Sequence, residues 1–228
     1  MPVSEVCRVS TTGRVDRRRS KIPVRNTPHW DSLSDWARAR ASRLVAPLVN
    51  GLDQLGVHPN TVTIVGFVLQ SCIGVVYALG HFRLGGGLLF LLAPVDALDG
   101  ALARATGKQS KFGAFLDSSL DRLSDSALIL GIAAYYLKRG AQLEVALFSL
   151  ALVGSLMVSY TRARAEALSF TCKVGWLTRM ERIVLIAGFT LLGLPGVLAW
   201  ALAVLSLVTV MQRILYVYKL SLQGEMIA

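Results

Sequence analysis

From residue 57 onward, long apolar runs alternate with short segments that contain Gly, Lys or Arg. The runs cover residues 62–79, 87–102, 115–137, 145–160 and 183–217. The last run is interrupted by Leu194-Pro195-Gly196, which predicts a turn because proline and glycine end helices. Counted in this way, the pattern predicts an all-α protein with six transmembrane helices. The fifth helix, residues 182–194, is shorter than the roughly 20 residues that a bilayer requires, so one kinked helix and five spans remain the alternative.

The segment before the first apolar run predicts two different structures. Residues 1–28 are basic and contain no apolar core, so we expect a disordered tail and not a cleaved signal peptide. Within residues 29–56, Trp36 and later apolar residues recur at helical spacing among arginines, which predicts an amphipathic helix on the membrane surface. Residues 57–228 would then form one transmembrane domain, whose first helix starts at the capping segment around Pro59.

Composition agrees with a membrane protein. Hydrophobic residues make up 54% of the 228, and 17% are charged, which is too apolar for a soluble globule of this length. Lysine and arginine number 24 against 14 acidic residues, and ten of these basic residues fall in the first 43 positions. Such a basic arm suits anionic lipid headgroups. The remaining basic residues form no continuous stripe, so we do not expect a nucleic-acid partner.

The distribution of basic residues between the apolar runs predicts the orientation. With six spans, both termini share one side with eight basic loop residues: Arg104, Lys108, Lys111, Arg162, Arg164, Lys173, Arg179 and Arg182. The opposite loops contain three, Arg83, Lys138 and Arg139. Because cytoplasmic loops are enriched in Lys and Arg, we expect a multi-pass cell-membrane protein with cytoplasmic termini. The glycine run 85–87 lacks the Lys and Ser/Thr of a phosphate-binding loop and predicts a flexible turn.

Four aspartates cluster where the second span ends and the third begins. Asp96 and Asp99 share a helix face with Gly100 and Ala103, at spacing i, i+3, i+4 and i+7. Asp117 and Asp121 lie one turn apart on the next helix. The two acidic faces are joined by a short cytoplasmic segment and can therefore converge.

Such a cluster requires compensating positive charge. Each carboxylate in apolar surroundings costs about 2.5 to 3.5 kcal/mol, so four cost on the order of 10 kcal/mol. The neighbouring Arg104 and Arg122 supply too little charge, whereas two hard divalent cations, which prefer oxygen ligands, balance four carboxylates. Glycines at 100 and 113 would let a bulky nucleotide approach the backbone. Helix capping and solvation at a membrane surface would explain one such aspartate more simply than all four.

This segment resembles the signature of the CDP-alcohol phosphatidyltransferase family, D-x2-D-G-x2-A-R-x8-G-x3-D-x3-D, at every fixed position. The resemblance implies that Asp96, Asp99 and Asp117 hold two Mg²⁺ or Mn²⁺ ions, and that Asp121 completes the second ion's shell or acts as general base. It also implies that CDP is bound by Gly100, Ala103, Arg104 and Gly113. The activity it implies is attack of an alcohol on the β-phosphorus of a CDP-linked lipid such as CDP-diacylglycerol, with release of CMP. A homodimer is a further expectation from the family, and small residues such as Gly131 would permit close helix contact.

The predicted acceptor site lies in a second basic loop. Arg179 and Arg182 are three residues apart and share a helix face, whereas Arg162 and Arg164 diverge by about 200°, so that one of them points inward. Guanidinium groups beside a metal site suit a phosphorylated acceptor. The loop also resembles the phosphatidylinositol-phosphate synthase branch, which implies inositol 1-phosphate, with Arg164 and Arg182 as first phosphate ligands and Arg162 and Arg179 as second. The alternative is that these arginines have no binding role and reflect only the enrichment of cytoplasmic loops in Lys and Arg.

Two other functions remain open at this point. Glycerol 3-phosphate also carries a phosphate, so a phosphatidylglycerophosphate synthase is the rival within the family. A cation transporter is the rival from another class, because intramembrane carboxylates can line an ion path. The acidic cluster lies towards one membrane face and not at the midplane, which argues against transport.

Overall fold

The computed structural model describes residues 51, 56–92, 102–103, 107, 109–172 and 174–225. The chain within these ranges is helical, and the structure is built from α2 (Pro59–Ala78), α3 (Phe82–Leu92), α5 (Lys111–Lys138), α6 (Gln142–Ala167), α7 (Arg179–Leu191) and α8 (Pro195–Glu225). The all-α prediction is thereby confirmed. The predicted tail, 1–28, and nearly all of the predicted surface helix, 29–56, lie outside the described residues.

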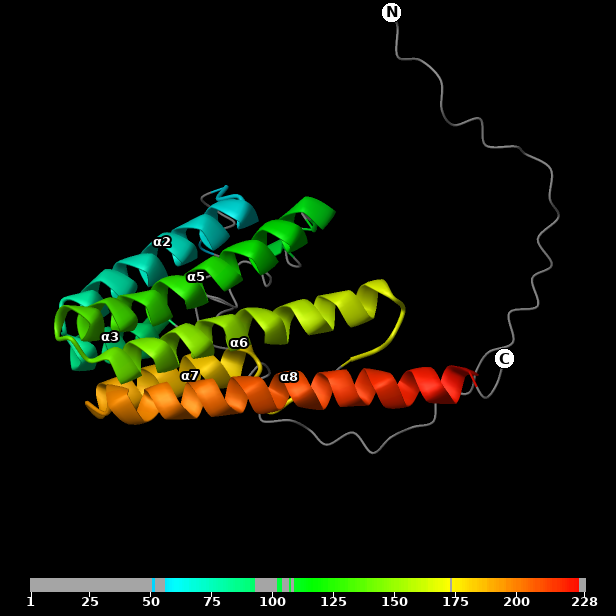
Figure 1. Cartoon of the computed structure of the whole chain (residues 1–228). Helices are drawn as coiled ribbons and strands as arrows, with labels where there is room; N and C mark the ends of the chain where they lie inside the picture. The colour runs from blue at the N-terminus through cyan, green and yellow to red at the C-terminus, as the bar shows by residue number, and fades with distance from the viewer. Residues whose placement is uncertain are drawn as a thin grey trace, which may run out of the picture.

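The helices form an antiparallel bundle in which neighbours pack along their length (Figure 1). Helix α2 lies along α5, α6 lies along α8, and α3 packs against α7. The short connections 79–81, 139–141 and 192–194 lie together at one end, which we call the turn end. The beginnings of α5 and α7 and the end of α6 lie at the other end, which we call the site end (Figure 1). This alternation brings residues from three distant parts of the sequence to one end of the bundle.

Fully buried apolar side chains fill the centre of the bundle. They include Tyr77 of α2, Ile132 of α5, Phe148 of α6, Ile186 of α7 and Leu202 of α8. Many large apolar side chains face outward on the same helices instead of being buried. Since lipid tails are as apolar as these side chains, close van der Waals packing holds such helices together more than the hydrophobic effect does.

Three of the described helices are long and apolar enough to cross a membrane: Pro59–Ala78, Gln142–Ala167 and Pro195–Leu222. Helix α3 is apolar but covers 11 residues, and α7 covers 13. Helix α5 has 28 residues but carries several charged side chains near its start. Because α7 ends at Leu191 and α8 begins at Pro195, the predicted turn between them is confirmed and the single kinked helix is not formed.

Two local predictions were wrong. The glycine run 85–87 belongs to α3 and is not a flexible turn. Gly85 packs on the ring of Tyr77, and a Cβ at Gly86 would lie 2.6 Å from the backbone nitrogen of Leu191, so these glycines serve close helix packing. The second basic loop is also shorter than predicted, because α6 continues to Ala167 and contains Arg162 and Arg164 in its last turns.

Candidate active site

Helix α5 carries a row of three aspartates near the site end. Asp117, Asp121 and Asp125 are four residues apart in succession, so they lie on one side of the helix. The helix begins at Lys111, where the Ser110 hydroxyl caps it by accepting a hydrogen bond from the Gly113 N–H at 2.9 Å. Asp117 and Asp121 are partly buried, and Asp125 is buried. The row therefore runs from the helix start into the bundle.

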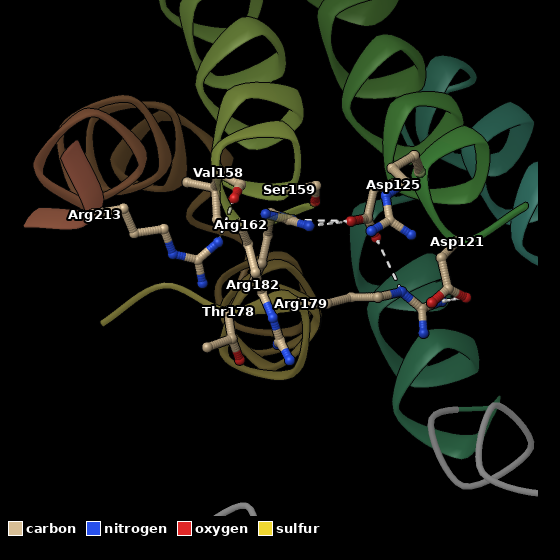
Figure 2. Close-up of a pocket in the computed structure, with 10 residues that line it drawn as sticks. Asp121, Asp125, Val158, Ser159, Arg162, Thr178, Arg179, Arg182 and Arg213 are labelled. Atoms are coloured by element: carbon tan, nitrogen blue, oxygen red, sulfur yellow. Dashed lines mark hydrogen bonds and ion pairs between the residues drawn. The ribbon is translucent and has the colours of Figure 1, made fainter. Parts of the chain in front are cut away.

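The start of α7 fixes the two arginines that face this row. Thr178 and Glu181 form a capping box, in which the Glu181 carboxylate accepts from the Thr178 N–H at 3.0 Å and the two side chains also contact. The box defines the first turn of α7, which contains Arg179 and leads directly to Arg182. As the spacing predicted, both arginines lie on the face of α7 that is turned towards α5 (Figure 2).

Ion pairs connect the two helices (Figure 2). Arg179 Nη2 lies 3.0 Å from Asp121 Oδ1, and Arg179 Nε lies 3.8 Å from Asp125 Oδ1. Arg182 donates from Nε to Asp125 Oδ2 at 3.0 Å, and its Nη2 contacts the same oxygen. The Arg182 side chain is 2% exposed, so its pair with Asp125 is a buried one. The candidate general base and the candidate phosphate ligands thus belong to one connected site.

A cavity of about 190 Å³ opens beside these pairs, and we call it the arginine cavity. It is lined by Asp121, Arg122, Asp125, Val158, Ser159, Arg162, Thr178, Arg179, Arg182 and Arg213. Five guanidinium groups face two carboxylates there, which is an excess of three positive charges. Arginine binds phosphate oxygens through a planar fork of N–H groups, so the lining suits a phosphorylated ligand.

Helix α6 contributes one of its two predicted arginines to this cavity. Arg162 lines it and forms an ion pair with Glu166 at 2.9 Å, and its side chain is 49% exposed. Arg164 is exposed and is absent from the lining. The sequence predicted that these two side chains diverge and that one of them points inward, and the structure agrees. The inward side chain is that of Arg162, whereas the resemblance ranked Arg164 first.

Arg213 of α8 also lines the arginine cavity, and sequence reasoning missed it. It is buried, its Nε donates to the Val174 carbonyl at 2.9 Å, and its Nη1 contacts the Val158 carbonyl. These contacts hold the segment before α7 against α6. A single arginine inside an otherwise apolar run was the available signal, because such a residue is costly in a membrane unless it has a partner or a function.

The glycine and alanine of the predicted nucleotide site are partly described. At Gly113 an added Cβ would lie 3.0 Å from Ser110 Oγ and 3.1 Å from Asn60 Oδ1, so the start of α5 packs closely on the start of α2. Ala103 is helical and partly buried. Gly100 and Arg104 lie outside the described residues.

The carboxylates that are described fit part of a metal site. Asp117 and Asp121 place carboxylate oxygens one helical turn apart. Hard divalent cations prefer oxygen ligands of this kind. Their predicted partners Asp96 and Asp99 lie outside the described residues. The part of the chain that is described contains no group of three His, Cys, Asp or Glu residues able to hold a metal ion.

Known proteins resemble this chain in sequence, and solved structures resemble it in fold. The family model of CDP-alcohol phosphatidyltransferases matches residues 56–212. The archaetidylinositol phosphate synthase of Pyrococcus horikoshii is 44% identical over 164 residues, which cover 72% of this chain and 85% of that protein.

Solved structures of a Mycobacterium tuberculosis phosphatidylinositol phosphate synthase have the same fold. The structure with CDP-DAG bound has a TM-score of 0.73 and 30% identity, and the match covers 77% of this chain and 94% of that one. The structure in complex with manganese and citrate has a TM-score of 0.71 and 30% identity, with 76% and 88% covered. This chain therefore belongs to the CDP-alcohol phosphatidyltransferase family, and it is a transferase of phospholipid synthesis.

Proposed function

We propose that this protein transfers the phosphatidyl group of CDP-diacylglycerol, or of a related CDP-linked lipid, to inositol 1-phosphate and releases CMP. The observation that carries the proposal is the arginine cavity, in which guanidinium groups lie beside the candidate base Asp121. A neutral alcohol would not need this excess of positive charge, whereas a phosphorylated one would. Membership of an enzyme family also argues against the cation transporter.

Inositol 1-phosphate is preferred to glycerol 3-phosphate because of the relatives. Both acceptors carry a phosphate that the arginine cavity could bind. The Pyrococcus and Mycobacterium proteins, however, are both named as synthases of inositol phosphate lipids. We assign the phosphate to Arg162, Arg179 and Arg182, with Arg164 retained from the family resemblance although it is exposed and outside the cavity lining.

Asp96, Asp99, Asp117 and Asp121 would hold two divalent ions, Mg²⁺ or Mn²⁺. The ions would supply positive charge that stabilises the diphosphate and the departing CMP. Support comes from the paired carboxylates of α5 and from the manganese complex of the Mycobacterium protein. Gly100, Ala103, Arg104 and Gly113 would bind the CDP moiety, in line with the CDP-DAG complex of the same protein.

Asp121 would act as the general base. Its carboxylate takes the proton of the acceptor hydroxyl, whose oxygen then bonds to the β-phosphorus of the CDP-linked lipid. The bond between that phosphorus and the bridging oxygen breaks, and CMP leaves with the bonding electrons. Arg179, 3.0 Å from Asp121 Oδ1, would fix the position of the carboxylate that acts as the base. The acceptor phosphate, bound by the arginines, keeps the hydroxyl beside Asp121.

We also propose that the helices form six membrane spans, with the site end in the cytoplasm and the active enzyme a homodimer. Three helices meet the length and hydropathy that a span needs, and the described basic residues of the site end outnumber those of the turn end. The dimer follows from family resemblance. Gly131 provides no support for it, because Gly131 packs on Gly74 of the same chain.

An acceptor panel tests the proposed function. Purified protein, CDP-diacylglycerol and Mg²⁺ are incubated with inositol 1-phosphate, glycerol 3-phosphate, inositol or serine, and CMP release is measured. We expect release with inositol 1-phosphate, and loss of release after EDTA with recovery on adding Mn²⁺. Turnover with free inositol or serine in place of phosphorylated acceptors would refute the phosphate site, and a preference for glycerol 3-phosphate would change the acceptor.

A further inference from the structure

Asp125 lies one helical turn beyond the last aspartate of the family signature, and no step proposed above uses it. Its side chain is 4% exposed. The Oδ2 atom contacts Nε and Nη2 of Arg182, and Oδ1 lies 3.8 Å from Nε of Arg179. One buried carboxylate, which is itself part of the lining of the arginine cavity, therefore approaches both arginines of α7 (Figure 2).

This contact determines how Arg182 is presented. A guanidinium group is planar and rigid, so fixing the edge that holds Nε and Nη2 also fixes the direction of Nη1. Nη1 is buried and has no hydrogen-bond partner within the described part of the chain, although Arg182 lines the arginine cavity. Since a buried donor without a partner is costly, an ordinary structural ion pair would be expected to satisfy it. An anion in the cavity would supply the missing acceptor.

We propose that Asp125 is a positioning residue for the acceptor: it holds Arg182 by one edge so that Nη1 faces the acceptor's phosphate. The same carboxylate also approaches Nε of Arg179, whose Nη2 contacts Asp121, and so helps to fix the phosphate ligands relative to the base. Asp125 itself would touch neither the nucleotide nor the acceptor. This inference rests on the proposed function, because it requires a phosphorylated acceptor in the arginine cavity.

The test compares Asp125→Asn and Asp125→Glu with the wild type. Asparagine keeps the shape but removes the charge, whereas glutamate keeps the charge and moves the carboxylate by one methylene group. Glu144→Gln is the matched control, because it makes the same carboxylate-to-amide change at the turn end of α6, away from the cavity. KM for inositol 1-phosphate and KM for CDP-diacylglycerol are measured separately, together with retention of the folded state on size-exclusion chromatography.

We expect Asp125→Asn to raise the acceptor KM about tenfold or more and to leave the CDP-diacylglycerol KM within about twofold of the wild type. Asp125→Glu should shift the acceptor KM in the same direction by a smaller factor, and Glu144→Gln should shift neither. In the Arg182→Ala background, Asp125→Asn should have little further effect, because residues that act through one another are not additive. Inorganic phosphate should inhibit Asp125→Asn more weakly than it inhibits the wild type.

Equal increases in both KM values, or additive effects of the two substitutions, would overturn the positioning role. Should Asp125→Asn fail to fold, the glutamate variant decides: an unchanged acceptor KM there would make Asp125 a purely structural residue. A wild type that turns over no phosphorylated acceptor would instead refute the proposed function. The two failures are therefore distinguishable.

Discussion

At the scale of single residues, the ion pair between Asp121 and Arg179 joins the candidate metal-binding side chains to the candidate phosphate-binding side chains. Asp121 belongs to the acidic row on α5, and Arg179 belongs to the arginine pair on α7. Both side chains are about a fifth exposed, 23% and 22%, so ligands can reach them. A carboxylate that is paired with an arginine, yet is accessible, suits both metal binding and proton transfer.

Asp121→Asn is expected to lower CMP release about a hundredfold or more while leaving the fold intact. An amide cannot accept the hydroxyl proton and binds divalent cations more weakly, and positioned general bases contribute about 10² to 10⁴ in rate. The partial exposure of Asp121 means that little packing is lost. CMP release and the thermal unfolding midpoint in detergent are measured in parallel. Turnover close to wild type would refute the base assignment.

The residues of the site differed in how far the sequence could reveal them. Asp117, Asp121, Arg179 and Arg182 follow helical spacing, so a pattern of i+3 and i+4 sufficed to bring each pair to one face. Arg213 could not be assigned in this way, because its role depends on the packing of α8 against α6 and the segment before α7. The choice between Arg162 and Arg164 likewise depended on the rotation of α6, which local spacing does not determine.

At the scale of elements, the contact between α2 and α5 depends on two glycines. A Cβ at Gly131 would collide with the backbone carbonyl of Gly74, and a Cβ at Gly74 would lie 2.5 Å from the Ala127 carbonyl oxygen. Backbone atoms cannot move aside as a flexible side chain can, so the two helices would have to separate. Small residues at helix contacts allow this close approach in membrane bundles.

Gly131→Ala should therefore destabilise the bundle by about 1 to 3 kcal/mol, the usual range for an overpacked core. Gly188→Ala in α7 is the matched control, because within the described part of the chain its added Cβ meets no atom within 4 Å outside its own turn of helix, and alanine favours a helix by about 1 kcal/mol. Thermal unfolding of the two variants in detergent is compared with the wild type. Equal midpoints for both variants would show that the α2 and α5 contact tolerates a side chain.

Helix boundaries were predicted well where capping chemistry is local, and poorly where tertiary packing decides. The start of α2 at Pro59 follows from its capping segment, in which His58 accepts from the Asn60 N–H. The glycine run in α3 was misread, since a run of three glycines is typical of a turn unless neighbouring helices fill the space beside it. Here Tyr77 and α7 fill that space, and no local pattern in the sequence specifies them.

At the scale of the whole molecule, the two ends of the bundle differ in chemistry. The site end carries the acidic row, the arginine pair and the arginine cavity, whereas the turn end consists of short connections between helices. The topology makes this separation possible, because an antiparallel bundle returns every second connection to the same end. The polar site thus lies at one end of the bundle, and the exposed apolar side chains along the helices are available for contact with lipid.

Cysteine labelling at the two ends of α5 tests this orientation. Gln109 and Lys138 are both exposed and flank that helix, so Gln109→Cys and Lys138→Cys form a matched pair. In a background with Cys7, Cys72 and Cys172 changed to serine, we expect a membrane-impermeant maleimide to label Lys138→Cys on intact cells. Gln109→Cys should react only after the membrane is permeabilised, because we propose that the basic site end faces the cytoplasm.

The labelling pattern separates three arrangements. Retained CMP release first shows that the serine background is folded. Labelling of Gln109→Cys alone on intact cells would invert the proposed orientation and put the arginine cavity on the outer side of the membrane. Labelling of both positions on intact cells would mean that α5 does not span the membrane. The charged residues near the start of α5 would then place this helix on the membrane surface. The proposal that the site lies at the end of a membrane-spanning bundle would be wrong.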